Sequence, residues 1–226
     1  MMKLMNSIIP NVVELFPDMI QALLETINMV SISGIISSLI GIPLGIILIV
    51  TREDNLLENK FIFNIVSKLV NIFRSIPFVI LLTAIIPITR FFVGTTIGTK
   101  GAIVPLIFGA TPFVARQIES ALLKVDPGVI EAARAMGSSP LEIIFRVLLL
   151  EGLPGIVYSL TITTISLIGF SAVAGTVGGG GLGDFAIRYG YQYFKTDVMI
   201  VTIIILLVIV NLIQSIGDIL LKKLSH

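Results

Sequence analysis

The sequence predicts an all-α integral membrane protein with about five transmembrane helices. Of its 226 residues, 55% are hydrophobic and only 13% are charged, whereas soluble domains carry about 25% charged residues. Three long stretches, residues 26–51, 152–183 and 198–217, contain no charged residue. Because a helix needs about 20 apolar residues to cross the hydrocarbon core, each stretch is long enough to span a bilayer. A soluble protein of this length could not bury all three in one core.

The apolar segments and the polar residues between them set the order of the expected spans. The polar run at 52–55 ends the first span, and Lys68 and Arg74 fall in the first half of the second. The spans are expected at residues 23–50, 61–86, 102–122, 153–177 and 196–220. No linker or internal repeat divides the chain, so we expect one transmembrane domain over 1–226 with its core at about 18–222.

The distribution of Lys and Arg predicts the orientation in the membrane, because cytoplasmic loops carry the excess of positive charge. With the N-terminus outside and the C-terminus inside, five positive residues lie outside: Lys3, Arg90, Lys100, Arg188 and Lys195. Ten lie on the cytoplasmic side: Arg52, Lys60, Lys68, Arg74, Arg116, Lys124, Arg134, Arg146, Lys222 and Lys223. The loop between the third and fourth spans is therefore expected in the cytoplasm.

That loop carries the start and stop signals of a short helix. Asp126 and Pro127 are an N-cap followed by a proline in the first turn. The helix is expected over 128–136, and Gly137 can end it in a left-handed conformation. A second helix then starts with a capping box formed by Ser139 and Glu142. Because the first helix is too short to span a bilayer and marginal alone in water, we expect it to dock on a partner.

The same loop resembles the EAA signature of ABC importer permeases, which reads Glu-Ala-Ala, three residues, Gly, nine residues, Ile-x-Leu-Pro. Here it stands as Glu131-Ala132-Ala133, Gly137 and the run at 147–150, in which Leu150 replaces the usual proline. Further runs are similar to methionine permeases, and neighbouring amino-acid permeases are the alternative. These runs are residues 71–78, 118–123, 131–137, 178–184 and 189–191.

This resemblance implies the partners and the coupling residues. Permeases of this family pair as homodimers in the bacterial cytoplasmic membrane, dock on two ATP-binding subunits and receive methionine from an extracellular binding (lipo)protein. ATP and Mg would lie on the partner subunit, so we expect no enzyme activity, cofactor or metal on this chain. The composition shows no basic patch for nucleic acid. The expected ATPase-coupling residues are Glu131, Ala132, Ala133, Arg134, Met136, Gly137 and Pro140.

Small and hydroxyl-bearing residues in the fourth span suggest a translocation pathway or gate, since such residues let helices approach and slide. Packing alone is the alternative for each of them. We find no acidic residue in the spans to hold an amino group, so we expect low affinity here and selectivity in the binding protein. Arg74 is either a pathway charge or a side chain that reaches the cytoplasmic interface. The pathway candidates are Tyr158, Gly169, Phe170, Ser171, Val173 and Gly175.

The glycine-rich run at 178–183 is expected to be an irregular outer loop, either a passive turn or a contact for the binding protein. The contact candidates are Gly181, Asp184, Tyr189 and Tyr191. Neither this run nor the one at 94–100 has the sequence order or context of a nucleotide site. Other functions remain open: a permease for another small amino acid or similar solute, a non-transporting anchor, or an ATP-independent transporter, which would need coupling acids or half-helix repeats.

Overall fold

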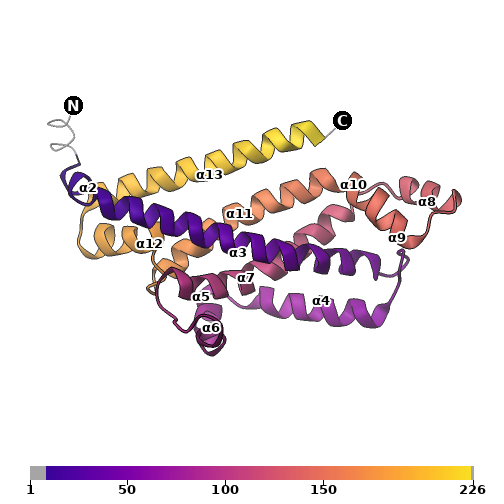
Figure 1. The fold of residues 1–226 in the computed structure, drawn as a ribbon, viewed down its shortest axis with the longest axis horizontal. Coiled ribbons are helices and arrows are strands. Elements are labelled where there is room, and N and C mark those ends of the chain that lie inside the picture. The colour runs from indigo at the N-terminus through magenta and orange to yellow at the C-terminus, as the bar shows by residue number, and fades with distance from the viewer. Residues whose placement is uncertain (1–8, 225–226) are drawn as a thin grey trace. The chain divides into compact units, whose positions relative to one another are not determined.

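The computed structural model describes residues 9–224, and within that range it contains helices and turns but no strand (Figure 1). The helices, in chain order, are α2 (Pro10–Glu14), α3 (Phe16–Val50), α4 (Lys60–Ser75), α5 (Phe78–Ala84), α6 (Ile86–Val93), α7 (Gly98–Leu122), α8 (Pro127–Ala135), α9 (Pro140–Ile143), η1 (Ile144–Leu148), α10 (Leu149–Glu151), α11 (Leu153–Gly175), α12 (Gly181–Phe185), η2 (Ala186–Gln192) and α13 (Thr196–Leu224). The segments η1 and η2 are π-helical.

Four helices, α3, α7, α11 and α13, are long and apolar enough to cross a membrane. They correspond to the first, third, fourth and fifth predicted spans, although α3 begins earlier than expected, at Phe16. The bent pair of α4 and α5 raises the number of candidate spans to five if it forms one span. The predicted all-α membrane fold with about five spans is confirmed.

The second predicted span is not one continuous helix. α4 ends at Ser75 and α5 begins at Phe78, and Ile76, the first of the two residues between them, has an extended backbone with φ −82° and ψ 121°. Ile76 precedes Pro77, and the proline ring disfavours a helical conformation in the residue before it. The second predicted span, residues 61–86, is therefore divided, because Pro77 ends α4.

Contacts within the chain divide the described residues into two compact units. The α12 unit comprises residues 9–35, 77–108 and 164–214, and includes α2, α5, α6, α12 and η2. The α8 unit comprises residues 36–76, 109–163 and 215–224, and includes α4, α8, α9, η1 and α10. The helices α3, α7, α11 and α13 contribute residues to both units.

Glycines bring α3 close to α7 in the α8 unit. A Cβ atom placed on Gly41 would lie 2.6 Å from Cβ of Val114, and one on Gly45 would lie 2.6 Å from Cβ of Ile118. Two glycines one turn apart form the small-residue stripe that lets membrane helices pack closely. The contact continues into a buried apolar cluster of Ile49, Val50, Val114, Ile118, Leu122, Ile144, Leu148 and Ile156.

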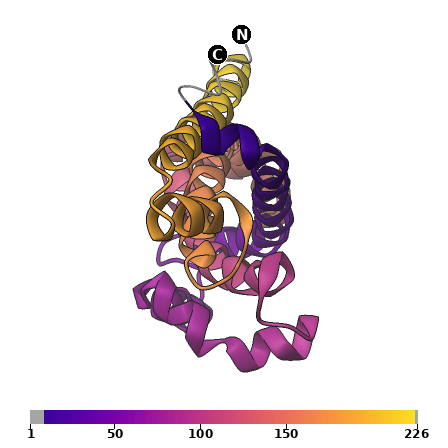
Figure 2. The same ribbon diagram turned by 90° about the vertical axis from the view of Figure 1, so that its left-hand side faces the viewer.

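Side-chain hydrogen bonds hold the α12 unit together. The backbone N–H and the side-chain amide of Asn11 donate to the carboxylate of Asp197, each at 3.0 Å, and so tie α2 to the start of α13. The carboxylate of Glu25 and the hydroxyl of Thr26 accept the first N–H groups of α12 at 2.8 Å. In Figure 2 the orange ribbon of α12 and η2 accordingly lies beside the indigo start of α3.

The glycine-rich run at 178–183 is partly helical. Residues 176–178 form a turn, residues 179 and 180 are irregular, and α12 begins at Gly181. Gly181 has φ +77°, and a Cβ atom there would lie 2.7 Å from Thr26 Oγ1 and from Met29 Cε. The prediction of an irregular loop is wrong for the second half of the run, because Glu25 and Thr26 satisfy the N–H groups that would otherwise stay unpaired at the start of α12.

Candidate functional site

The short helix predicted in the loop between the third and fourth spans is present as α8. The Asp126 side chain accepts the N–H of Gly128 at 2.8 Å, and Pro127 lies in the first turn. Gly137 follows the helix with φ +85°, a left-handed conformation that glycine adopts without steric cost. The next N–H, of Ser138, reaches back to the carbonyl of Ala133 at 3.1 Å. The predicted cap and stop signals are confirmed.

One face of α8 packs on its own unit and the other is open. Ala133 is only 3% exposed, and Ile130 packs against the buried apolar cluster. Among the predicted coupling residues, Glu131, Ala132, Arg134, Met136, Gly137 and Pro140 are exposed. Met136 is 79% exposed, and Leu141 and Phe145 in the adjoining α9 and η1 are also exposed apolar side chains. An anchored helix with exposed apolar neighbours has the character of an interaction surface.

The predicted capping box fixes the start of α9. Ser139 Oγ accepts the N–H of Glu142 at 3.4 Å, and the Glu142 carboxylate accepts the N–H of Ser139 at 2.9 Å. These bonds, first from the Ser139 backbone and then from its hydroxyl, lower the pKa of Glu142. Pro140 occupies the first helical turn. The π-helix η1 follows directly, and such wide turns are frequent at functional sites.

Two of the predicted pathway residues on α11 are buried in the α12 unit. Ser171 Oγ donates to the carbonyl of Ile168 at 2.8 Å. A Cβ atom on Gly175 would collide with the backbone nitrogen of Asp184. The glycine therefore permits close contact between α11 and α12.

The other pathway candidates are partly or fully accessible. Phe170 stacks on Phe78 of α5 with ring centroids 4.6 Å apart, and Val173 is half-buried. Gly169 is exposed, and nothing lies within 4 Å of a Cβ atom built on it. Tyr158, in the α8 unit, is exposed as well. The structure thus brings Phe170 together with the short helix after the break in the second span.

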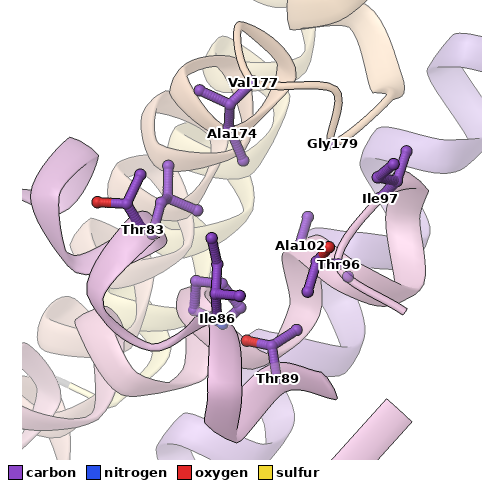
Figure 3. A pocket seen from close by; sticks show the side chains of 12 residues that line it. Thr83, Ile86, Thr89, Thr96, Ile97, Ala102, Ala174, Val177 and Gly179 are labelled. Atoms are coloured by element: carbon purple, nitrogen blue, oxygen red, sulfur yellow. The ribbon is translucent and has the colours of Figure 1, made fainter. Parts of the chain in front are cut away.

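A cavity of about 170 Å³ lies in the α12 unit between α5, α6, the start of α7 and the end of α11 (Figure 3). Thr89 is 2% exposed, and its hydroxyl has no hydrogen-bond partner among the described residues. Thr83, on the same cavity, donates its hydroxyl to the carbonyl of Ile80 at 2.9 Å. No pattern in the sequence predicted this cavity. Its lining residues are Leu82, Thr83, Ile86, Thr89, Thr96, Ile97, Gly101, Ala102, Pro105, Ala174, Val177 and Gly179.

Arginines line a second cavity, of about 410 Å³, in the α8 unit. Arg74 lies exposed in the last turn of α4 and contributes to this cavity together with Arg52 and Arg116. Arg116 is paired with Glu119, whose side chain is only 6% exposed. The expectation that no acidic residue lies within the spans is therefore wrong. Glu119 is tolerated in α7 because Arg116, one turn earlier, neutralises it, and this spacing was the signal available in the sequence.

The four predicted contact residues of the outer segment differ in accessibility. Gly181 is buried, as described above, whereas Tyr191 is exposed. Asp184 pairs with Arg188 one turn later, and this hydrogen bond raises the pKa of Arg188. The Arg188 guanidinium in turn lies 5.7 Å from the ring centroid of Tyr189. Tyr191 is thus part of an accessible surface. Asp184 and Tyr189 are linked to that surface through Arg188, whose side chain is about half exposed.

Two further aromatic residues on this segment were missed in the sequence. Tyr193 lies 5.8 Å from Tyr189, centroid to centroid, and Phe194 is 84% exposed with φ +56°. A large exposed aromatic side chain held in a left-handed conformation is an uncommon combination. The signal in the sequence was the gathering of four aromatic residues, Tyr189, Tyr191, Tyr193 and Phe194, within six positions.

Comparison with known proteins places the chain in a family. The model of the binding-protein-dependent transport system inner membrane component family matches residues 41–226. The chain is 54% identical over 202 residues to a probable D-methionine transport system permease protein of Vibrio cholerae serotype O1, covering 89% of this chain and 90% of that protein. It is 50% identical over 157 residues to the D-methionine transport system permease protein of Escherichia coli strain K12, covering 70% and 72%.

Solved structures of ABC transporters are similar to this chain. An inward-facing conformation of the MetNI methionine ABC transporter superposes with a TM-score of 0.89 at 47% identity, covering 92% of this chain and 96% of that one. An amino acid ABC transporter crystallised with histidines gives a TM-score of 0.80 at 21% identity over 95% and 98% of the two chains, which shows a shared fold. The chain belongs to the family of binding-protein-dependent transport system inner membrane components.

Proposed function

We propose that this chain is the permease subunit of an ATP-driven ABC importer that carries methionine, in its D form, its L form or both, into the bacterial cytoplasm. The observation that carries the proposal is α8, a capped helix anchored through Ala133 with its other face exposed. The choice of methionine as the substrate is supported by relatives that share about half of their aligned residues with this chain and are named as D-methionine permeases. A helix presented in this way suits docking on a motor subunit, and no docking helix is needed in an anchor protein.

The assembly would contain two permeases and two ATP-binding subunits. Each α8 would dock on one ATP-binding subunit through Glu131, Ala132, Arg134 and Met136, while Ala133, Gly137 and Pro140 set the geometry of the loop. ATP and Mg belong to those subunits. The excess of Lys and Arg around this loop supports an orientation with the N-terminus outside and the C-terminus inside, and the four helices shared by both units support one transmembrane domain.

On the outside, an extracellular methionine-binding lipoprotein would deliver the substrate. Asp184, Tyr189 and Tyr191 would contact it, and Gly181 would hold the start of α12 in place. The passage through the permease would follow α11, with Arg74 as a charge of the pathway or of the cytoplasmic interface. The proposed lining and gating residues are Tyr158, Gly169, Phe170, Ser171, Val173 and Gly175.

Coupling would act through the chain between α8 and α11. Movement of the ATP-binding subunits would press on α8, and α9, η1 and α10 lead from there directly into α11. Alternating access requires elements with two discrete arrangements. Small residues on α11 allow its neighbours to slide without large steric barriers.

Uptake by reconstituted vesicles tests the proposal. Proteoliposomes containing this permease and its ATP-binding subunit, supplied with the binding protein, are expected to accumulate labelled methionine only when ATP is available to the ATP-binding subunits. Omitting the binding protein or replacing ATP by a non-hydrolysable analogue should abolish accumulation. Full-rate methionine flux through the permease alone, without nucleotide, would refute an ATP-driven importer. Transport of another amino acid with methionine excluded would refute the substrate.

A further inference from the structure

We infer that the cavity of Figure 3 is a side-chain pocket that receives the apolar, sulfur-containing end of the transported amino acid, with the unpaired Thr89 hydroxyl as a polar contact. This inference rests on the proposed function. It adds a position for the substrate side chain and a residue that distinguishes sulfur from carbon.

The walls of the cavity select the kind of group that can enter. None of its twelve lining residues is charged. In Figure 3 the side chains of Ile86, Ile97, Ala174 and Val177 surround the open space. A charged ammonium or carboxylate would lose its hydration here without a counter-charge, so an amino acid would enter with its side chain and leave its charged groups outside.

The volume suits a short, unbranched side chain. The cavity measures about 170 Å³, and an apolar cavity of roughly 150 Å³ accommodates benzene. The methionine side chain is smaller than benzene in heavy atoms, and its thioether is flexible and polarizable, so it adapts to an irregular apolar surface.

The unpaired hydroxyl of Thr89 indicates that the cavity binds a ligand. Its hydroxyl is buried, lines the cavity and has no partner among the described residues. Buried polar groups are nearly always hydrogen-bonded, and helical threonines commonly donate to the carbonyl four residues earlier, as Thr161 and Thr202 do here. A thioether sulfur is a weak acceptor, whereas the methylene that replaces it in norleucine accepts nothing.

Three variants test this role. Thr89→Val removes the unpaired hydroxyl without changing the shape of the side chain, and Thr89→Ser keeps the hydroxyl. The matched control is Thr202→Val, because the Thr202 hydroxyl is also buried in the α12 unit but is bonded to the carbonyl of Val198 at 2.8 Å and does not line the cavity. For each complete importer, ATP-dependent uptake of labelled methionine and of norleucine is measured on the same vesicles. The ratio of the two uptakes is independent of the amount of folded permease, and the preference of the binding protein is common to all variants.

We expect Thr89→Val to lower the methionine-to-norleucine ratio by about two- to tenfold, the effect of one modest hydrogen bond. Its thermal stability should be unchanged or higher, because an unsatisfied buried hydroxyl is removed. Thr89→Ser and Thr202→Val should keep the wild-type ratio. An unchanged ratio in Thr89→Val, or an equal loss in Thr202→Val, would overturn the pocket while leaving the importer function intact. If wild-type vesicles fail to transport methionine at all, the proposed function itself has failed.

Discussion

Hydrogen bonds from Arg116 join α7 to α4 and should contribute to the stability of the permease. Arg116 Nη1 donates to Glu119 at 2.5 Å, and its Nη2 contacts the Ser67 hydroxyl at 2.5 Å, the Ser67 carbonyl at 3.3 Å and the Asn71 amide oxygen at 2.9 Å. Arg116→Met removes all of these contacts. It also leaves the Glu119 carboxylate buried without a counter-charge.

The expected loss in the free energy of unfolding depends on how deeply Arg116 and Glu119 are buried. Removing one partner of a buried ion pair costs about 3–5 kcal/mol. The side chains of Arg116 and Glu119 are 18% and 6% exposed, and they border the arginine-lined cavity, so we expect the lower end, about 3 kcal/mol. Glu119→Gln keeps the contacts of Arg116 to α4 and should cost about 1–2 kcal/mol. The double variant has no unpaired carboxylate, so its cost should fall below the sum by about 1–2 kcal/mol.

Unfolding of the purified permease in mixed detergent micelles, with increasing denaturing detergent, measures these differences. Lys60→Met is the matched control, because its ion pair with Glu53 is exposed at both ends and its loss should leave the unfolding midpoint unchanged. If the Arg116 and Glu119 variants are additive to within about 0.5 kcal/mol, the two residues do not act as a pair and the reasoning fails.

Three other variants have distinct expected outcomes. Gly137→Val forces a β-branched residue into a left-handed conformation, so ATP hydrolysis should continue while methionine uptake is lost; normal coupled uptake would contradict this. Ser139→Ala should raise the Glu142 pKa toward 4.5, as read from a carboxyl-carbon NMR titration. Because the folded pKa is lowered, the stabilisation is present above pH 4.5 and disappears as the pH falls through the folded value; an unchanged titration would contradict the cap. Asn11→Ala should lower the opening free energy of α2 by about 1–2 kcal/mol, because the bond from the side-chain amide to Asp197 is lost while the bond from the backbone N–H remains. Hydrogen exchange of the 11–14 amides that stays at the wild-type rate would contradict it.

The features that the sequence predicted correctly depend on neighbours along the chain. α8 and the start of α9 follow from Asp126, Gly137 and Ser139, whose caps involve residues within five positions. The four continuous spans follow from apolar length alone. Local chemistry and length are visible in a single sequence, so these elements could be placed before the structure.

Two features were not predicted, the break between α4 and α5 and the cavity around Thr89, and they differ in cause. The break at Pro77 has a local signal, a proline within a long apolar segment, because proline disfavours a helical backbone at Ile76. Apolar length alone does not reveal this break. The cavity around Thr89 is different, because it is assembled from α5, α6, α7 and α11. No pattern within one helix indicates that a particular threonine will lack a hydrogen-bond partner.

The close approach of α3 and α7 has a consequence for how relatives of this chain can diverge. A Cβ atom on Gly41 would lie 2.6 Å from Cβ of Val114 and 3.0 Å from the carbonyl oxygen of Thr111. One on Gly45 would lie 2.7 Å from the carbonyl oxygen of Ala115. Because a smaller side chain on α7 keeps its Cβ and cannot remove a backbone oxygen, a larger residue at position 41 or 45 needs a wider helix separation. Homologous permeases that keep this helix spacing should therefore keep glycine at both positions.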